Sequence, residues 1–479
     1  MLDLDTLRPD HLGCYGYKRD TSPAIDSIAE DSMRFENYYC SNAPCLPSRA
    51  ALTTGLFGIH TGAINHGDTT ADIRLFGNGR GFQDQCLTGG LFYSFRNAGL
   101  HTATVSSFAE RHSSYWFNAG FNEVINCGGC GGEGAEVVFP LAMDWLERNA
   151  DKDDWFLHVN MWDPHTPYRA PAEFGNPFEK DPLPEWFNED VLKEHLAHVG
   201  PHSINEIGMY GDYTNPELPR QLGKAASLDE IKQVIDGYDC GIRYMDGFIN
   251  QILEFLKSKG LYEDMAVIVT SDHGENLGEL GLYSEHGTAD LITTRVPMLI
   301  KWPGKKTGEE RGLHYNVDLL PTMAELFGQP DPQRDGRSYA ETLNTGADTG
   351  RDYLVLSQCS HVCQRSVRFD DYIYIRTYHD GFHLFPTEML FNIAEDFHEQ
   401  HNLAGERPDL CGRACRYLED WHQENMMKSK SDTDPMWTVI REGGPYHAKG
   451  NLKGYCERLE KTGRSEGARL LRAKHPEEF

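Results

Sequence analysis

A cysteine occupies an unusual setting in the stretch SNAPCLPSRAALTTG, which covers residues 41–55. Pro47 suits the first turn of a helix, where its missing N–H group costs nothing, and Gly55 is typical of a helix end. The sequence therefore predicts that Cys45 lies just before the N-terminus of a short helix, where the partial positive charge of the backbone favours anions. A core cysteine has no need of this setting, so we expect Cys45 to react, either as a thiol or as a group made from it.

Two further groups of chemistry-bearing residues stand at the ends of predicted strands, far apart in the sequence. Asp3 and Asp5 lie in DLDTLRPD, whereas Asp272 and His273 lie in VIVTSDHGE. Functional groups gather at the carboxyl ends of strands in an open α/β sheet, so we expect these side chains to converge. Carboxylates with an imidazole make a mostly oxygen-lined site for a hard divalent cation. Each aspartate taken alone also fits a turn former or a helix cap.

Alternating strand and helix patterns supply the framework that must bring these residues together. Residues 101–107, 155–162, 265–274 and 296–302 are rich in β-branched and aromatic side chains, as buried strands are. Helical patterns cover 22–32, 138–149 and 227–260, and the last of these begins with a capping box at Ser227 and Glu230 and ends at Gly260. This alternation predicts an α/β fold.

A second, smaller unit is predicted beyond residue 350. Residues 329–350 fit a linker, residues 353–358 and 371–378 have strand patterns, and a helix is expected near 407–426. We therefore expect an α/β domain that carries the reactive residues over 1–340. A smaller antiparallel sheet with a packed helix is expected over 350–428, and an extension of unassigned shape over 429–479.

The composition is that of a globular protein with a strong acidic excess. The 479 residues are long enough for one large domain and a smaller one, and 39% apolar with 25% charged residues is ordinary for folded proteins. The formal net charge of −28 argues against broad docking on nucleic acid or anionic membranes, although it leaves room for a local basic pocket. No apolar run approaches the roughly 20 residues of a membrane span. Together with the acidic net charge, this leads us to expect neither a nucleic acid nor a membrane as partner.

The start of the chain and its cysteines bear on the compartment. MLDLDTLRPD has neither the basic start nor the apolar segment of a signal peptide, so the chain as printed predicts a cytoplasmic protein. MLDLD also resembles the last part of a buried strand, which leaves a start further upstream open. Disulfides are expected in a secreted protein and reduced thiols in a cytosolic one, with a structural zinc site as the weaker alternative. The twelve cysteines include the pairs Cys127–Cys130, Cys359–Cys363 and Cys411–Cys415.

The residues around Cys45 match a family signature. Cys45-Leu46-Pro47-Ser48-Arg49, continued through Gly55, resembles the sulfatase signature C-x-P-S-R-x-x-L-x-T-G at every fixed position. DTLRPDHLGCYGY resembles the first metal-binding strand and turn of that family, and PHTPY, SDHGE, RVPMLIKWPG and LFNIAEDFHEQHNLA resemble its later blocks in order. The resemblance covers most of residues 1–405. The chain is thereby identified as a member of the type I sulfatases in the alkaline phosphatase superfamily. This implies a large mixed β-sheet sandwiched by helices, with a smaller C-terminal α+β domain.

The resemblance also implies covalent catalysis. In this family the signature cysteine is oxidised to Cα-formylglycine by a maturation partner, a formylglycine-generating or anaerobic sulfatase-maturating enzyme. One hydroxyl of the hydrated aldehyde attacks the sulfur of a sulfate ester, and deprotonation of the other collapses the hemiacetal and expels sulfate. A thiol has no second hydroxyl with which to eject the product, so Cys45 is implied to be the precursor of the nucleophile.

A metal site is implied by position. Asp5, Asp272 and His273 match the family's metal ligands, with Ca²⁺ as the usual ion and Mg²⁺ or Mn²⁺ as alternatives. Many sulfatases have two adjacent aspartates in the first strand, whereas here Asp5 is followed by a threonine. Asp3 lies two residues back on the same strand face, so we expect it to supply the missing carboxylate or to support the ligands.

Three further residues are implied to act on the sulfate group. Arg49 is expected to neutralise and orient the hydrated aldehyde, because its fork suits clustered oxygens. His165 matches a histidine that contacts the sulfate or the bridging oxygen. Many relatives carry a lysine near position 285, whereas this chain has Glu285 with His286 beside it. We expect His286 to be the general acid or a sulfate donor, with a purely supporting role as the alternative.

A lysine-histidine motif that many members carry after the third strand is not recognisable in VSSFAERHSSYW. Its replacement is open among Ser106, Ser107, Arg111 and His112. The residues that closely follow the signature helix fit either pocket residues or ordinary loop residues, and these are His60, Asn65 and His66.

The combined expectation is an enzyme, a sulfuric ester hydrolase acting on a sulfated carbohydrate or a small sulfate ester. A phosphonate monoester or phosphodiester hydrolase of the same superfamily is the alternative, because sulfate and phosphate look alike to a metal ion and an arginine. A non-catalytic binding protein is a third interpretation, which the retained signature and aspartates disfavour. Residues 441–464 are locally basic and fit either a contact with an anionic glycan or a subunit contact, so a homo-oligomer stays open.

Overall fold

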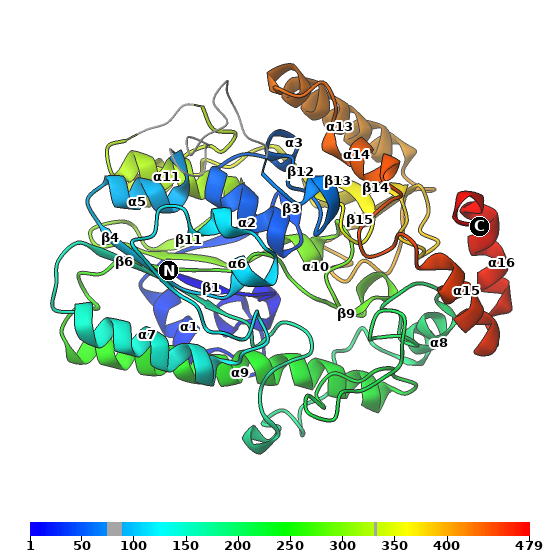
Figure 1. Cartoon of the computed structure of the whole chain (residues 1–479), viewed down its shortest axis with the longest axis horizontal. Coiled ribbons are helices and arrows are strands. Elements are labelled where there is room, and N and C mark those ends of the chain that lie inside the picture. Colours follow the sequence, from blue (N-terminus) through cyan, green and yellow to red (C-terminus); the bar gives the residue numbers. More distant parts are fainter. Residues whose placement is uncertain (74–88, 330–332) are drawn as a thin grey trace.

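The structure is a computed structural model that describes residues 1–73, 89–329 and 333–479. Its centre is an eight-stranded sheet with the strand order β11-β2-β10-β7-β1-β6-β4-β5 (Figure 1). β1 pairs in parallel with β6 and β7, whereas β10 runs antiparallel to β7 and β2, so the expected mixed sheet is confirmed. The strands are β1 (Leu2–Leu4), β2 (Met33–Tyr39), β4 (His101–Val105), β5 (Glu123–Ile125), β6 (Trp155–Met161), β7 (Val267–Thr270), β10 (Met298–Lys301) and β11 (Gly308–Tyr315).

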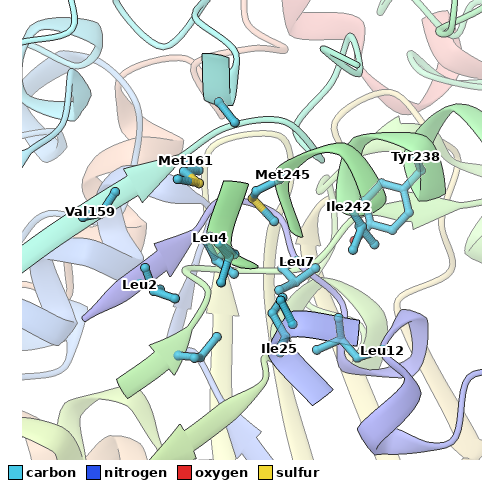
Figure 2. Close-up of a cluster of buried hydrophobic side chains, with 14 of the residues drawn as sticks. Leu2, Leu4, Leu7, Leu12, Ile25, Val159, Met161, Tyr238, Ile242 and Met245 are labelled. Atoms are coloured by element: carbon cyan, nitrogen blue, oxygen red, sulfur yellow. The ribbon is translucent and has the colours of Figure 1, made fainter. Parts of the chain in front are cut away.

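Helices cover both faces of this sheet (Figure 1). On one face lie α1 (Pro23–Glu30), α7 (Ala135–Asn149) and α9 (Leu228–Ser258). On the other face lie α2 (Cys45–Thr54), α5 (Leu91–Asn97) and α11 (Leu319–Leu326). Figure 2 shows part of the first layer, where Leu4 of β1 clusters with Ile25 of α1 and Ile242 of α9. Burial on both faces explains why inner strands such as β7, with the sequence VIVT, and β10, with MLIK, are mostly apolar.

The long helix α9 begins close to the predicted cap. The Oγ of Ser227 accepts a hydrogen bond from the backbone N–H of Glu230 at 3.3 Å, as the capping box predicts. The Glu230 carboxylate accepts from the N–H of Ala226 at 2.7 Å, one residue earlier than the motif requires. The cap therefore satisfies two backbone N–H groups at the start of α9, and the second of them belongs to the residue before the N-cap instead of the N-cap itself.

A smaller five-stranded sheet has the order β15-β14-β13-β12-β3 and is antiparallel except for the pair β3 and β12. α13 (Pro408–Lys428) packs against it, so the predicted α+β unit is confirmed. β3 ends only two residues before Cys45 and pairs with β12 through Asn42 and Ser357. The smaller sheet therefore anchors the chain that leads into α2. Its strands are β3 (Asn42–Ala43), β12 (Tyr353–Gln358), β13 (Cys363–Phe369), β14 (Tyr372–His379) and β15 (Glu388–Asn392).

Two segments differ from the sequence expectation. The expected linker 329–350 contains α12 (Ala340–Thr345), because Tyr339 and Leu343 are buried in the same cluster as Leu319 and Met323 of α11; its residues 330–332 lie outside the described residues. The extension 429–479, to which the sequence assigned no shape, forms α14 (Pro435–Arg441), α15 (Leu452–Lys461) and α16 (Ser465–Lys474). The domain ranges 1–340, 350–428 and 429–479 stay predictions.

The described residues show neither a disulfide nor a helix suited to span a membrane. The described cysteines are free thiols, and Cys86 lies outside the described residues. None of the described helices combines the length and apolar character that crossing a membrane requires.

The short elements that complete the framework are α3 (Gly58–Thr61), α6 (Phe108–Arg111), α8 (Glu189–Ala197), α10 (Leu291–Thr294), β8 (Asn276–Leu277) and β9 (Tyr283–Glu285).

Candidate active site

Cys45 is the first residue of α2, and its side chain is buried. The helix ends at Gly55, whose φ of 66° is left-handed, so the predicted helix start and stop are confirmed within one residue. The Cys45 Sγ lies 3.0 Å from Nε2 of His273. Burial and the nearby Asp5 carboxylate raise the pKa of the Cys45 thiol to about 12. Without a cation beside it, the unmodified thiol is therefore protonated at neutral pH.

Arg49 lies one turn further along α2 and is fully buried among three carboxylates. Its Nε and Nη2 bind the two oxygens of Asp3 at 2.9 and 3.1 Å. Its Nη1 lies 2.9 Å from Asp5 and also donates to Asp272. The rings of Phe108 and Trp162 lie 4.8 and 5.6 Å from the guanidinium carbon. The guanidinium is thus fixed by charge and by aromatic contact.

Asp5 and Asp272 come from the carboxyl ends of two neighbouring parallel strands, whereas Asp3 lies within the first of these strands. Asp5 directly follows β1, and Asp272 lies two residues after β7, which pairs with β1. Both carboxylate oxygens of Asp5 are buried and accept no hydrogen bond. Burial and the neighbouring Asp272 raise the pKa of Asp5 to about 8. One guanidinium does not balance three carboxylates, so this site favours a further cation.

His273 is oriented by its own backbone. Its Nδ1 lies 2.9 Å from the carbonyl oxygen of Gly274, and a carbonyl only accepts, so Nδ1 carries the proton. Nε2 therefore presents its lone pair to the site. Metal-binding histidines are held in this way, with the second nitrogen donating to a carbonyl or carboxylate. Ligand atoms of Asp5, Cys45, Asp272 and His273 all lie within 4.8 Å of one another and can hold a metal ion.

Asp3 lies beside this four-residue group and not within it. Its carboxylate is occupied by the fork of Arg49, and Nε2 of His158 lies 3.3 Å from its Oδ2. The arginine holds the pKa of Asp3 down to about 2 despite its burial. Metal ligation by Asp3 stays a prediction, while its contacts favour the alternative role of holding Arg49 in place.

His165 and His286 face the same site from two other segments. His165 donates from Nδ1 to the carbonyl of Thr166 at 2.5 Å, which leaves Nε2 3.9 Å from Asp5. The ring of His286 lies 4.1 Å from that of His273 and 5.4 Å from that of His165. Its Nδ1 lies 3.3 Å from Glu275 and its Nε2 lies 3.0 Å from Glu285. These carboxylates raise the pKa of His286 well above its usual value, so the imidazole holds a proton available for donation.

Some of the remaining sequence candidates lie near the reacting groups, whereas the others contact different parts of the chain. Arg111 lies 3.5 Å from Nε2 of His165, and His66 and His112 form a group with Cys45 within 4.8 Å. Ser106 and Ser107 instead bond to Asn160 and Glu133. The others hold loops: His60 pairs with Asp335, and Asn65 accepts from the backbone of Tyr446.

Several neighbouring residues escaped the sequence analysis. The rings of Trp162 and Phe108 contact the Arg49 guanidinium, and His447 from the C-terminal extension contacts His66 at 3.0 Å. Glu275 was available as the last residue of the quoted SDHGE block. No pattern around His202, His361 or His447 points to the site, because each reaches it only through tertiary packing.

This fold and this arrangement are those that the resemblance to the sulfatases implied. The chain belongs to the sulfatase family, whose model matches residues 3–329. It is 25% identical over 430 residues to the choline-sulfatase of Rhizobium meliloti (strain 1021), covering 80% of this chain and 77% of that protein. It is 26% identical over 392 residues to the iduronate 2-sulfatase of Homo sapiens, covering 70% of this chain and 69% of that protein.

A solved structure supports the fold. The phosphonate monoester hydrolase from Silicibacter pomeroyi superposes with a TM-score of 0.66 at 20% identity, over 91% of this chain and 96% of that chain. Family and fold agree, and the chain is a sulfatase-family enzyme that hydrolyses sulfate esters.

Arg49→Lys should lower kcat/KM for an aryl sulfate by roughly 100-fold or more, since a single ammonium cannot bind both oxygens of Asp3 and also reach Asp5 and Asp272. Arg34→Lys is the matched control, because Arg34 pairs with Glu36 and Glu309 near the surface. Steady-state kinetics on both variants, with circular dichroism to establish folding, make the test. A loss of only a few-fold at Arg49 would remove it from the catalytic group.

Proposed function

We propose that this enzyme removes sulfate from a sulfated carbohydrate or a small sulfate ester through a Cα-formylglycine made from Cys45. The observation that carries this proposal is the position of Cys45 at the start of α2, in one buried group with Asp5, Asp272 and His273. A thiol has no second hydroxyl with which to expel sulfate, so oxidation to an aldehyde that hydrates gives this position both the attacking hydroxyl and the hydroxyl that releases the product. The oxidation requires a maturation enzyme as partner.

Asp5, Asp272 and His273 are the proposed ligands of a divalent cation. The residues fit such an ion, because both oxygens of Asp5 are buried without a hydrogen bond and His273 presents an unprotonated Nε2. A donor set dominated by carboxylate oxygens favours Ca²⁺, with Mg²⁺ or Mn²⁺ as alternatives. When bound, the ion supplies Lewis-acid polarisation of a sulfuryl oxygen and favours the ionised form of the attacking hydroxyl.

The other side chains bind, orient and protonate. Arg49, held rigidly by Asp3, neutralises and orients the oxygens at position 45. His286, between Glu275 and Glu285, is proposed to donate its proton to the leaving oxygen. His165, with its Nε2 directed toward Asp5 and Arg111, is proposed to contact the sulfate group.

The proposed substrate class is supported by the names of similar proteins, and the alternative activity by the similar tetrahedral shapes of sulfate and phosphonate groups. One relative is named a choline-sulfatase and another an iduronate 2-sulfatase, so a small ester and a sugar-derived ester both occur among similar proteins. A phosphonate monoester or phosphodiester hydrolase is the second candidate. A tetrahedral phosphonate presents similar oxygens to the cation and to Arg49, so the reacting groups alone discriminate weakly.

The sulfatase assignment is tested by comparing kcat/KM for an aryl sulfate and for an aryl phosphonate monoester with the same leaving group. The enzyme should be produced with a formylglycine-generating enzyme and supplied with Ca²⁺. The sulfate should be the better substrate, and much faster phosphonate cleavage would reverse the assignment. A panel of sulfated mono- and disaccharides then separates carbohydrate substrates from small esters.

Cys45→Ala should abolish turnover with little effect on folding, because the residue is built for reaction and its loss removes the nucleophile. Cys240→Ala, a buried cysteine of α9 remote from the site, should keep the activity. Peptide mass spectrometry across residue 45 should show the aldehyde in protein made with its maturation enzyme. A near-normal rate in Cys45→Ala would refute the assignment, and an unmodified thiol in matured protein would favour a binding protein.

His286→Gln should slow esters of poorly acidic alcohols by about 10²–10⁴-fold while nearly sparing an aryl sulfate with a good leaving group, because only the former needs a proton. His60→Gln is the control, since His60 pairs with Asp335 outside the reacting group. The measurement is kcat over a series of leaving groups. An equal loss across the series would assign His286 a supporting role instead of proton donation.

A further inference from the structure

A second cluster of ligand-type side chains lies beside the catalytic group and shares no residue with it. It consists of His202, Glu285 and His361, which are 5%, 5% and 6% exposed. One ligand atom from each residue lies within 4.8 Å of the other two. The three come from separate segments: the loop after α8, the last residue of β9, and the turn between β12 and β13. Tertiary folding therefore gathers two imidazoles and a carboxylate at one buried point.

The hydrogen bonds of His202 determine which of its nitrogens faces the cluster. Its Nδ1 lies 2.9 Å from the carbonyl oxygen of Ile207, and because a carbonyl only accepts, Nδ1 is the donor. In the neutral ring Nε2 then carries a lone pair. This is the arrangement that orients histidines at metal sites.

His202 and Glu285 approach each other closely inside the cluster. Nε2 of His202 lies 2.9 Å from Oε2 of Glu285, yet this buried nitrogen has no hydrogen-bond partner. With Nε2 unprotonated, its lone pair and the carboxylate oxygen repel each other at that separation. A proton on Nε2 or a metal ion bound by both atoms removes this repulsion, and the second imidazole beside Glu285, that of His361, supplies the further ligand that a metal ion needs.

His361 is held in place on several sides. Its Nε2 lies 3.5 Å from Oε1 of Glu285, and its ring stacks on that of His447 at 4.2 Å and 17°. Its backbone N–H donates to the side chain of Gln358 at 3.1 Å. These contacts leave the imidazole little freedom, which lowers the entropic cost of placing it as a ligand.

The backbone at His202 supports a functional role. Its φ of 59° is in the left-handed region, which costs a residue with a side chain and persists where surrounding structure enforces it. The His202 carbonyl accepts from the N–H of Tyr283 at 2.9 Å, and Tyr283 begins the strand that ends at Glu285. The strained residue and the carboxylate are therefore tied to the same strand.

We propose that His202, Glu285 and His361 bind a divalent transition-metal ion such as Zn²⁺. Two histidines and one glutamate are a donor set that zinc accepts with a fourth position open, and imidazoles select such ions over Ca²⁺. The proposed site shares no ligand residue with the Asp5 group. The two sites adjoin each other through His286, which lies 3.0 Å from Glu285 and whose ring lies 5.9 Å from that of His361. The proposal does not depend on the proposed function, because it concerns binding of a metal and not turnover.

The test is a Co²⁺ titration of the full chain, followed by visible absorption, with Zn²⁺ competition measured by calorimetry. The protein should carry Cys45→Ala, because this variant removes the sulfur ligand from the other possible metal-binding groups that contain residue 45. The solution should contain excess Ca²⁺ to occupy the Asp5 group. One Co²⁺ per chain should bind at this cluster with the absorption of a four-coordinate site, and Zn²⁺ should displace it.

Variants of the cluster decide whether the ion binds there. His361→Ala and the isosteric Glu285→Gln should each weaken Co²⁺ binding at least about tenfold. The control is His314→Ala, which removes the histidine of a different group with Glu310 and Asp348 and should leave this binding unchanged. Absence of saturable binding overturns the proposal and leaves the cluster as a purely ionic network. Equal affinity in the variants, or loss only in His314→Ala, also overturns it. Because the titration measures metal binding and not turnover, none of these outcomes depends on the sulfatase assignment.

Discussion

The charge imbalance around one buried guanidinium constrains the rest of the site. Arg49 is fully buried, and it is the common partner of Asp3, Asp5 and Asp272. Removing charged groups from water is costly unless partners compensate, and here one positive charge faces three negative ones. Asp5 is the least compensated of the three, because its oxygens have no hydrogen bond and burial beside Asp272 raises its pKa to about 8, so it ionises fully only with a further cation beside it. The interaction that fixes α2 on the carboxyl ends of β1 and β7 therefore also creates the demand for a divalent cation next to Cys45.

The smaller sheet forms part of this site as well as supporting it. β3 leads into Cys45 and is paired with β12, and Gln358 at the end of β12 donates to the carbonyl oxygen of His286 at 2.9 Å. The same Gln358 accepts from the backbone of His361. One amide side chain thus links the proposed proton donor of the first cluster to a ligand of the second. The position of the smaller sheet is consequently coupled to the geometry of both.

The sequence predicts the parts of the site that are local in the chain. The helix start at Cys45 and the strand-end positions of Asp5 and Asp272 follow from turn chemistry and sheet topology. β13 escaped prediction because its sequence CQRSVRF carries charges although every residue is buried; Arg365 is compensated by Asp434 from the C-terminal extension. A pairing across 69 residues leaves no periodic signal. The same limit applies to His202, His361 and His447, whose contacts with the site arise only from tertiary packing.

Glu285 determines the charge balance on one side of the pocket. That carboxylate is buried and its surroundings consist of imidazoles: His202 at 2.9 Å, His286 at 3.0 Å and His361 at 3.5 Å. A buried carboxylate in this setting needs positive charge, which a proton on His286 and an ion between His202 and His361 both provide. The proposed proton donor and the proposed metal cluster thus depend on the same buried carboxylate.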